Sequence, residues 1–225
     1  VAAGGGSILQ FKYGRYLVGP LSAGANPGPA SYRLGGPLTV TDANVLLGRL
    51  PVEYVPFAFG HSGTEPLDRN AVKTLFSDLQ ETMFNSVAKA PALEAMAQSF
   101  LTVAVDKMAQ AIEKISVQRG FDVTKYALVC YGGAAGQHVI KIAEKLGIEK
   151  VILPAAAGVL SAVGIGLAPR RVLKEQTIDL PLSDENLAEI REQFKSLAHQ
   201  ANNELVLSAS TQAQLEGEIL LKPEA

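Results

Sequence analysis

Apolar residues recur every three or four positions along much of this 225-residue chain, a spacing that predicts amphipathic helices. The longest such stretch covers residues 91–119, and Gly120 follows it as a helix stop. A shorter apolar stripe begins after Asp68, which is a residue type that caps helix starts. By the same rule, Thr41 is the expected cap of an earlier helix and Ser183 of the last one.

Other stretches favour β-strands. Two short runs rich in apolar and aromatic residues, 8–11 and 15–18, flank Gly14, which predicts a β-hairpin with its turn at or near that glycine. The apolar run at 127–131 predicts a strand that is buried on both faces. Further strands are expected at 172–180 and at 214–222, because apolar and polar residues alternate there.

The strand at 127–131 is followed by Gly132 and Gly133, by a helical pattern that stops at Gly147, and by a strand at 150–154. Glycines place no Cβ in the way of a ligand, and open α/β sheets bind ligands at the carboxyl ends of their strands. The sequence GGAAG lacks both the GxGxxG spacing and the Gly-Lys-Ser/Thr of a Walker A loop. Two interpretations therefore stay open: a tight strand-to-helix connection in a packed core, or a turn that contacts a ligand.

Composition restricts the class of protein. A chain of this length with 48% hydrophobic residues can bury a full core, as one domain or as one domain plus part of a second. Its 20 basic and 22 acidic residues give a net charge of −2, so nucleic acid is not an expected partner. No apolar run approaches the roughly 20 residues of a membrane span. The single cysteine, Cys130, suits a reducing compartment and is expected to pack as a small, inert hydrophobe.

Several loops hold further candidate residues. The GGGS loop at 4–7 suits either an anion held on backbone N–H groups or a tightly bent connection. Asp42 follows the Gly- and Pro-rich segment 19–37, and it is either a helix-start charge or an acid of a site. His61 is expected at the surface. The glycines within 155–168 are expected to allow close packing of a small-residue helix.

Taken together, several long blocks resemble the hydantoinase A / 5-oxoprolinase family over nearly the whole chain. The matching blocks are AAGGGSI at 2–8, VGPLSAGANPGPASY at 18–32, GGPLTVTDANVLLGRLP at 35–51, YGGAAGQHVIKIAEKLGI at 131–148 and GVLSAVGIGLA at 158–168. The GQH that ends at His138 is more similar to the 5-oxoprolinase branch. Leu21 and Ser31 depart from the family, which usually has an acid and a cysteine at these places. The start at Val1, without an initiator methionine, is typical of a fragment of a longer chain.

The resemblance implies an α/β fold of the actin-like ATPase type, which is an RNase H-like lobe with a mixed sheet and flanking helices. Residues 1–170 would form the ATPase-lobe fragment, and residues 171–225 would begin a C-terminal region. No D-x-G-G-T phosphate loop occurs in the chain, no metal-ligand set is expected in it, and no catalytic residue is identified. The implied adenosine contacts are Gly132, Gly133 and Ala134. Candidate polar contacts to the cofactor are Gln137 and His138. The candidates for the phosphate or substrate side are Gly5, Gly6, Ser7 and Asp42.

The resemblance also implies an ATP-dependent amidohydrolase that opens a cyclic amide, either 5-oxoproline to glutamate or a hydantoin, with ATP and Mg²⁺ as cofactors. An unstrained lactam is a poor electrophile, so phosphorylation of the amide oxygen would supply a leaving group. Two alternatives stay open: an ATP-dependent ketone carboxylase subunit, and a non-catalytic module for nucleotide binding or subunit assembly. The expected partners are the cyclic amide and a hydantoinase B-like subunit or domain, in a homo- or hetero-oligomer located in the cytoplasm. The fragment alone is expected to be inactive.

Overall fold

The structure is a computed structural model, and it describes residues 4–84, 91–181 and 183–207. The chain divides into two compact units, Val1–Val163 and Gly164–Ala225. Both helices and strands are present, one strand pair being parallel and the other antiparallel, which confirms the predicted α/β class. The strand predicted at 214–222 lies outside the described residues. No helix in the described part of the chain is both long enough and apolar enough to span a bilayer.

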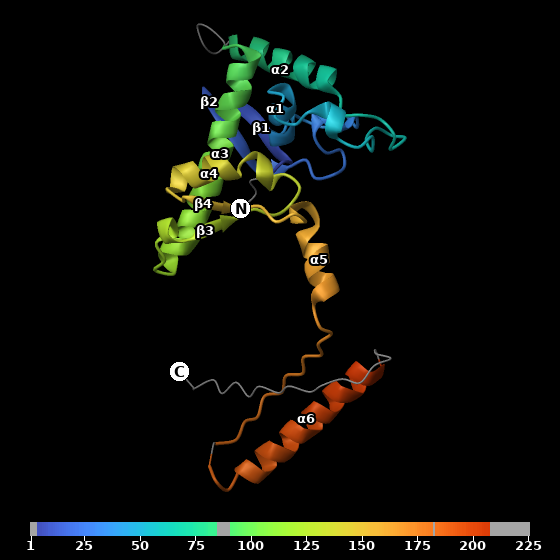
Figure 1. Ribbon diagram of the computed structural model, residues 1–225, viewed down its shortest axis with the longest axis vertical. Coiled ribbons are helices and arrows are strands. Elements are labelled where there is room, and N and C mark those ends of the chain that lie inside the picture. Colours follow the sequence, from blue (N-terminus) through green and yellow to red (C-terminus); the bar gives the residue numbers. More distant parts are fainter. Residues whose placement is uncertain (1–3, 85–90, 182, 208–225) are drawn as a thin grey trace. The chain divides into compact units, whose positions relative to one another are not determined.

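The elements of the first unit follow one another as labelled in Figure 1. Short 3-10 turns connect several of them. In chain order the strands and helices are β1 (Ser7–Lys12), β2 (Arg15–Ser22), α1 (Val40–Leu46), α2 (Arg69–Phe84), α3 (Leu93–Gln118), β3 (Ala127–Val129), α4 (Val139–Leu146) and β4 (Lys150–Ile152), with α5 (Leu160–Leu167) reaching across the boundary between the units.

The predicted hairpin is confirmed. β1 and β2 pair antiparallel, and Lys12 lies opposite Arg15 across a two-residue turn. Both turn residues, Tyr13 and Gly14, have positive φ, at 55° and 71°. This turn matches the natural twist of paired strands, and glycine adopts it without steric strain.

The helix α1 begins two residues earlier than its predicted cap implies. Thr41 was the predicted cap, but Thr39 occupies that position and Val40 is the first helical residue. The reason is Asp42, whose carboxylate accepts hydrogen bonds from the backbone N–H and the hydroxyl of Thr39, at 2.8 and 2.9 Å. The carboxylate of Asp42 thus completes a capping box, whose Thr-x-x-Asp spacing at 39–42 is present in the sequence but did not enter the prediction.

The predicted stripes on the next two helices are confirmed. Asp68 caps α2, and its Oδ1 accepts the N–H groups of Asn70 and Ala71, both at 2.9 Å. α3 ends at Gln118, with the Gly120 stop at φ +72°. The core of the unit lies where α1, α2, α3 and the hairpin meet. Its largest fully buried side chains are Phe76, Phe100, Met83, Met96 and Leu101.

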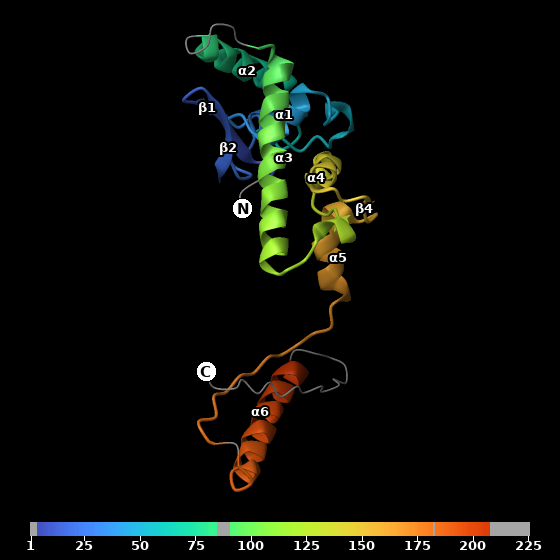
Figure 2. The ribbon, with the colours of Figure 1, turned by 90° about the vertical axis from the view of Figure 1, so that its left-hand side faces the viewer.

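Figure 2 shows α3 along its length, with the hairpin on one side and α4 and β4 on the other. The ring of Phe100 packs edge-on against Tyr16 of β2, with 4.8 Å between the ring centroids. Further along α3, Met108 and Ile112 lie near Leu128 of β3, because all three line one cavity. α3 therefore packs against the hairpin on one side and against α4 on the other, where a cavity separates it from β3.

The burial predicted for the strand at 127–131 is wrong. β3 pairs only with β4 among the described residues, and the pairing is parallel. Val129 and Tyr131 are 48% and 61% exposed, whereas Cys130 is buried at 4%. The face of Leu128 and Cys130 lies toward α3 and α4, whereas no described element covers the face of Val129 and Tyr131.

The second unit contains α6 (Leu187–Leu207) and an irregular segment before it. The strand predicted at 172–180 is absent, since that segment has no strand partner among the described residues. The segment is held to α6 by an ion pair between Lys174 and Glu204, and Gln176 donates to Gln193 at 3.2 Å. α6 begins at Leu187, four residues after the predicted cap, Ser183.

The close packing predicted for the small-residue helix is not observed. A Cβ added at Gly158, Gly164 or Gly166 would meet no atom of the described residues within 4 Å. No residue of α5 is buried, although nearly all of its side chains are apolar. A helix that is apolar on all sides is normally found in the interior of a protein.

Candidate functional site

The glycine turn lies at the carboxyl end of β3, as the sequence predicts. Two backbone hydrogen bonds fix it: the N–H of Cys130 donates to Ile152 at 2.9 Å, and the N–H of Gly132 donates to Ala157 at 2.8 Å. Gly132 has φ +95°, a conformation that side chains rarely adopt. Gly133 does not have positive φ, and open space lies where its Cβ would be. The turn therefore presents an uncovered backbone.

A cavity of about 330 Å³ opens beside this turn. Gly132, Ala134 and His138 form one part of its wall, and Met108 and Ile112 of α3 form another. The wall from α3 was not predicted from the sequence. The apolar stripe of α3 does predict a covered face there, but it does not say what covers that face. Gly133 and Gln137 do not line the cavity; the N–H of Gln137 donates to Ala134 at 3.2 Å within the 3-10 turn.

His138 is the polar residue whose environment is most unusual. Its side chain is 3% exposed, and neither ring nitrogen has a hydrogen-bond partner among the described residues. A buried polar group without a partner destabilises the fold by roughly 1–3 kcal/mol. Burial lowers the pKa of the imidazole below its ordinary value of 6.5, and the charge of Arg49 lowers the pKa further. The ring is therefore held neutral and offers one donor and one acceptor.

This depressed pKa predicts a pH dependence of stability. The unfolded chain takes up a proton on His138 near pH 6.5, but the folded chain resists it. The stability that comes from the neutral ring is present above that pH and is lost as the pH falls toward the lower folded pKa. We expect the melting temperature of the full-length protein to fall more steeply from about pH 7 to about pH 5.5 than that of a His138→Gln variant.

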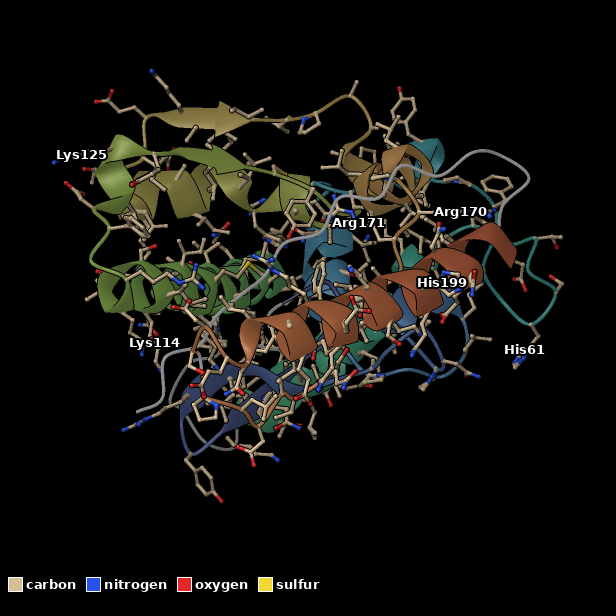
Figure 3. All side chains as sticks on the ribbon, turned by 90° about the horizontal axis from the view of Figure 1, so that it is seen from below. His61, Lys114, Lys125, Arg170, Arg171 and His199 are labelled. Carbon is tan, nitrogen blue, oxygen red and sulfur yellow. The ribbon has the colours of Figure 1, made fainter. Side chains whose placement is uncertain are left out.

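The control for this measurement is His61→Gln. His61 is exposed, as predicted, and its side chain points outward from its loop (Figure 3). This variant should keep the pH dependence of the wild-type protein. Parallel curves for the wild-type protein and His138→Gln would show that protonation of His138 is not coupled to folding.

The glycine loop at the start of β1 lies against the same turn. A Cβ on Gly5 would be 3.4 Å from the Cβ of Ala134 and 2.7 Å from Thr41 Oγ1. The carbonyl of Gly5 accepts both the N–H and the hydroxyl of Thr41, at 2.9 and 3.0 Å, and the carbonyl of Gly6 accepts from Ala23 at 2.8 Å. The structure thus brings Gly5 next to the adenosine candidates, which are more than 120 residues away in the sequence.

Ser7 and Asp42, the other two candidates for the phosphate or substrate side, lie inside the fold. The hydroxyl of Ser7 accepts the N–H of Gly4 at 3.0 Å, and Ser7 is 2% exposed. Asp42 is fully buried, and its carboxylate also accepts the N–H groups of Ala30 and Ser31, at 3.1 and 2.9 Å. These bonds make Asp42 the anchor of the loop before α1. A role for either side chain toward phosphate or substrate stays a prediction.

Comparison with known proteins adds three findings. The family model for hydantoinase/oxoprolinase matches residues 1–174. The chain is 41% identical to the 5-oxoprolinase of Dictyostelium discoideum over 92% of this chain and 17% of that protein. It is 47% identical to the 5-oxoprolinase PfmaA of Pestalotiopsis fici over 75% of this chain and 13% of that protein. The chain thus spans about a sixth of the length of these relatives.

One solved structure is also similar. The ATP-dependent caprolactamase from Pseudomonas jessenii superposes with a TM-score of 0.62 and 33% sequence identity. The match covers 88% of this chain and 29% of that chain.

Proposed function

The chain belongs to the hydantoinase/oxoprolinase family, and from this premise we propose that it is part of an ATP-dependent enzyme that opens a cyclic amide. We propose 5-oxoproline as the substrate, since the two relatives named 5-oxoprolinase are 41% and 47% identical, against 33% for the caprolactamase structure. The full-length protein would then carry out the reaction, since this chain is a small part of the relatives' length. Residues 1–170 would form part of an actin-like ATPase lobe, and residues 171–225 would begin the next region.

The observation that carries this proposal is the uncovered turn at 132–134. The site fits the adenosine part of ATP in two respects: Gly133 has open space at its Cβ position, and His138 holds unpartnered nitrogens beside the cavity. Gly132 and Gly133 would let the ligand approach the backbone, while His138 and Gln137 would supply hydrogen bonds. Gly5, Gly6 and Ser7 would lie toward the phosphates.

The chemistry requires more than this chain holds. When bound with Mg²⁺, ATP would supply the phosphoryl group and the free energy for opening an unstrained lactam. The residues of this chain would bind and orient the nucleotide, and positioning accounts for much of phosphoryl-transfer catalysis. A hydantoinase B-like subunit or domain would complete the enzyme, in a cytoplasmic assembly. No base is assigned within this chain.

The test of the function is the substrate dependence of ATP hydrolysis. The full-length protein should hydrolyse ATP in the presence of 5-oxoproline and release glutamate in equal amount. Stimulation by a ketone with bicarbonate, and none by 5-oxoproline, would favour the carboxylase alternative. Binding of ATP without stimulation by either would favour the non-catalytic module.

The test of the site is Gly133→Val in the full-length protein. Position 133 does not have positive φ, and no atom of the described residues lies within 4 Å of its Cβ position, so we expect a valine there to fit without backbone strain or collision. We expect an unchanged melting temperature without nucleotide and an ATP dissociation constant raised about 10-fold or more, which corresponds to about 1.4 kcal/mol.

Gly164→Val is the matched control. Gly164 also lacks positive φ and has nothing within 4 Å, and it lies outside the proposed site. This variant should bind ATP as the wild-type protein does. Wild-type ATP affinity in a stable Gly133→Val variant would remove the adenosine contact from this turn and leave it as a structural connection.

A further inference from the structure

β3 has a backbone edge that no described strand covers. Successive residues of a strand direct their N–H and C=O groups to opposite sides. The N–H of Cys130 donates to Ile152, so Cys130 faces β4. The backbone groups of Val129 and Tyr131 therefore point to the other side, where the described residues form no strand.

The outer face of the same strand pair is apolar. Val129, Tyr131 and Ile152 are exposed by 48%, 61% and 50%. Parallel sheets occur almost only with both faces covered, and a two-stranded sheet is at best marginally stable alone. The β3–β4 pair thus has the composition of an interior sheet without the neighbours that such a sheet requires.

The cavity beside the turn follows this free edge. Five consecutive residues, from Leu128 to Gly132, line it together with residues of α3 and α4, whereas no residue of β4 does. Gly4 lines it as well. Apart from His138, the side chains around it are mainly apolar. An apolar cavity beside strand N–H and C=O groups that no described strand pairs with suits another β-strand better than water.

We propose that in the full-length protein a β-strand from the polypeptide outside these 225 residues lies along the free edge of β3. It accepts and donates hydrogen bonds at Val129 and Tyr131, and its inward side chains fill the part of the cavity beside these residues, leaving the turn at 132–134 and His138 open to a ligand. Apolar residues of the same polypeptide cover the outer face. β3 is then a central strand.

Two observations favour the same polypeptide as the source of the strand. The chain spans 17% and 13% of two relatives, so most of the polypeptide lies outside it. In addition, Gly4 lines the cavity and Gly5 lies against Ala134, so polypeptide that leads into this loop arrives at the carboxyl end of β3. A strand that ends there runs parallel to β3, as β4 does.

Native-state amide exchange on the full-length protein tests the proposal without ATP and without any substitution. The amides of Val129 and Tyr131 should exchange at least about 100-fold more slowly than an unprotected peptide, as slowly as that of Cys130. The internal control is Cys130, whose amide is bonded to β4 and should be protected whether or not a further strand is present. Fast exchange at Val129 and Tyr131, with Cys130 protected, would mean that β3 is an edge strand and would overturn the proposal.

Dilution distinguishes a strand that comes from the same polypeptide from a strand that a second copy of the protein supplies. Protection supplied within one polypeptide does not depend on protein concentration. If protection at Val129 and Tyr131 disappears when the protein is diluted to monomer, a second copy supplies the strand and the proposal is wrong. Neither result depends on the ATPase activity, so the proposed function can fail independently.

Proline substitutions give a second measurement. Val129→Pro removes an N–H that an edge strand does not use but a central strand does. We expect it to lower the melting temperature as much as Cys130→Pro, which removes the bond to Ile152. Val129→Thr keeps the N–H and should melt near the wild-type temperature. A Val129→Pro variant as stable as Val129→Thr would contradict the proposal; if the proline variants do not fold, the exchange experiment decides.

Discussion

Replacing Gly36 with alanine is expected to lower, by roughly 10 °C, the melting temperature of the domain that contains it. The added Cβ would collide with the carbonyl oxygen of Gly28 and lie 2.9 Å from the carbonyl carbon of the same residue. It would also lie 3.1 Å from the oxygen of Pro29. These are backbone atoms that cannot rotate away, so the loop itself must move. We expect a loss of about 3 kcal/mol, at roughly 3 °C for each kcal/mol.

The neighbouring glycine provides the control. Gly35 has φ +72° and nothing within 4 Å of its Cβ position. Gly35→Ala should therefore cost only the backbone strain of a left-handed alanine, about 1 kcal/mol or a few degrees. Comparing the melting temperatures of the two variants distinguishes the collision of the added Cβ at position 36 from the backbone strain at position 35. Equal losses for the two variants would show that the backbones of residues 28 and 36 are not in close contact.

Asp42→Asn is expected to destabilise the protein by about 3 kcal/mol, again near 10 °C. Both carboxylate oxygens of Asp42 accept hydrogen bonds: Oδ1 from Ser31 and Oδ2 from Ala30 and Thr39. An asparagine has one acceptor oxygen, so in either orientation its NH₂ group faces a buried N–H. Because the site is fully buried, water cannot take over the lost bonds.

Asp68→Asn is the same change at a helix cap that is only partly buried. Asparagine caps helices about as well as aspartate, so the loss there is limited to the ion pair with Arg33, at 3.0 Å, worth at most about 1 kcal/mol. The difference in stability between Asp42→Asn and Asp68→Asn is measured from their melting temperatures. Amide exchange at Ser31, which should accelerate in Asp42→Asn alone, shows whether the loop has been released. Similar stability of the two variants would mean that Asp42 is not the anchor of this loop.

The sequence was sufficient to predict those features that depend only on residues close together in the chain. The stripe of α3, the hairpin turn at Tyr13 and Gly14, and the stop at Gly147 all follow from spacing and from glycine's access to positive φ. The family blocks were also sufficient to identify the family, which the comparison confirms. Their specificity comes from several long matches in the right order, which no single motif has.

The candidate site was predictable only in part. The sequence placed the glycine turn after a strand, and the structure confirms that position. It did not show that Gly5 packs against Ala134, or that α3 supplies a wall of the cavity. These contacts join residues that are far apart in the chain, and no periodic pattern reports them. The binding roles of the turn residues stay predictions.

The sequence by itself determined the family, the α/β class and most helices, because these depend on composition and on residue spacing. Only the tertiary structure decided the burial of each element. The apolar run at 127–131 has the composition of an interior strand, yet three of its five residues are exposed, since burial depends on the strands and helices that pack beside it. Asp42 is polar and yet fully buried, since backbone N–H groups from a distant loop satisfy its charge.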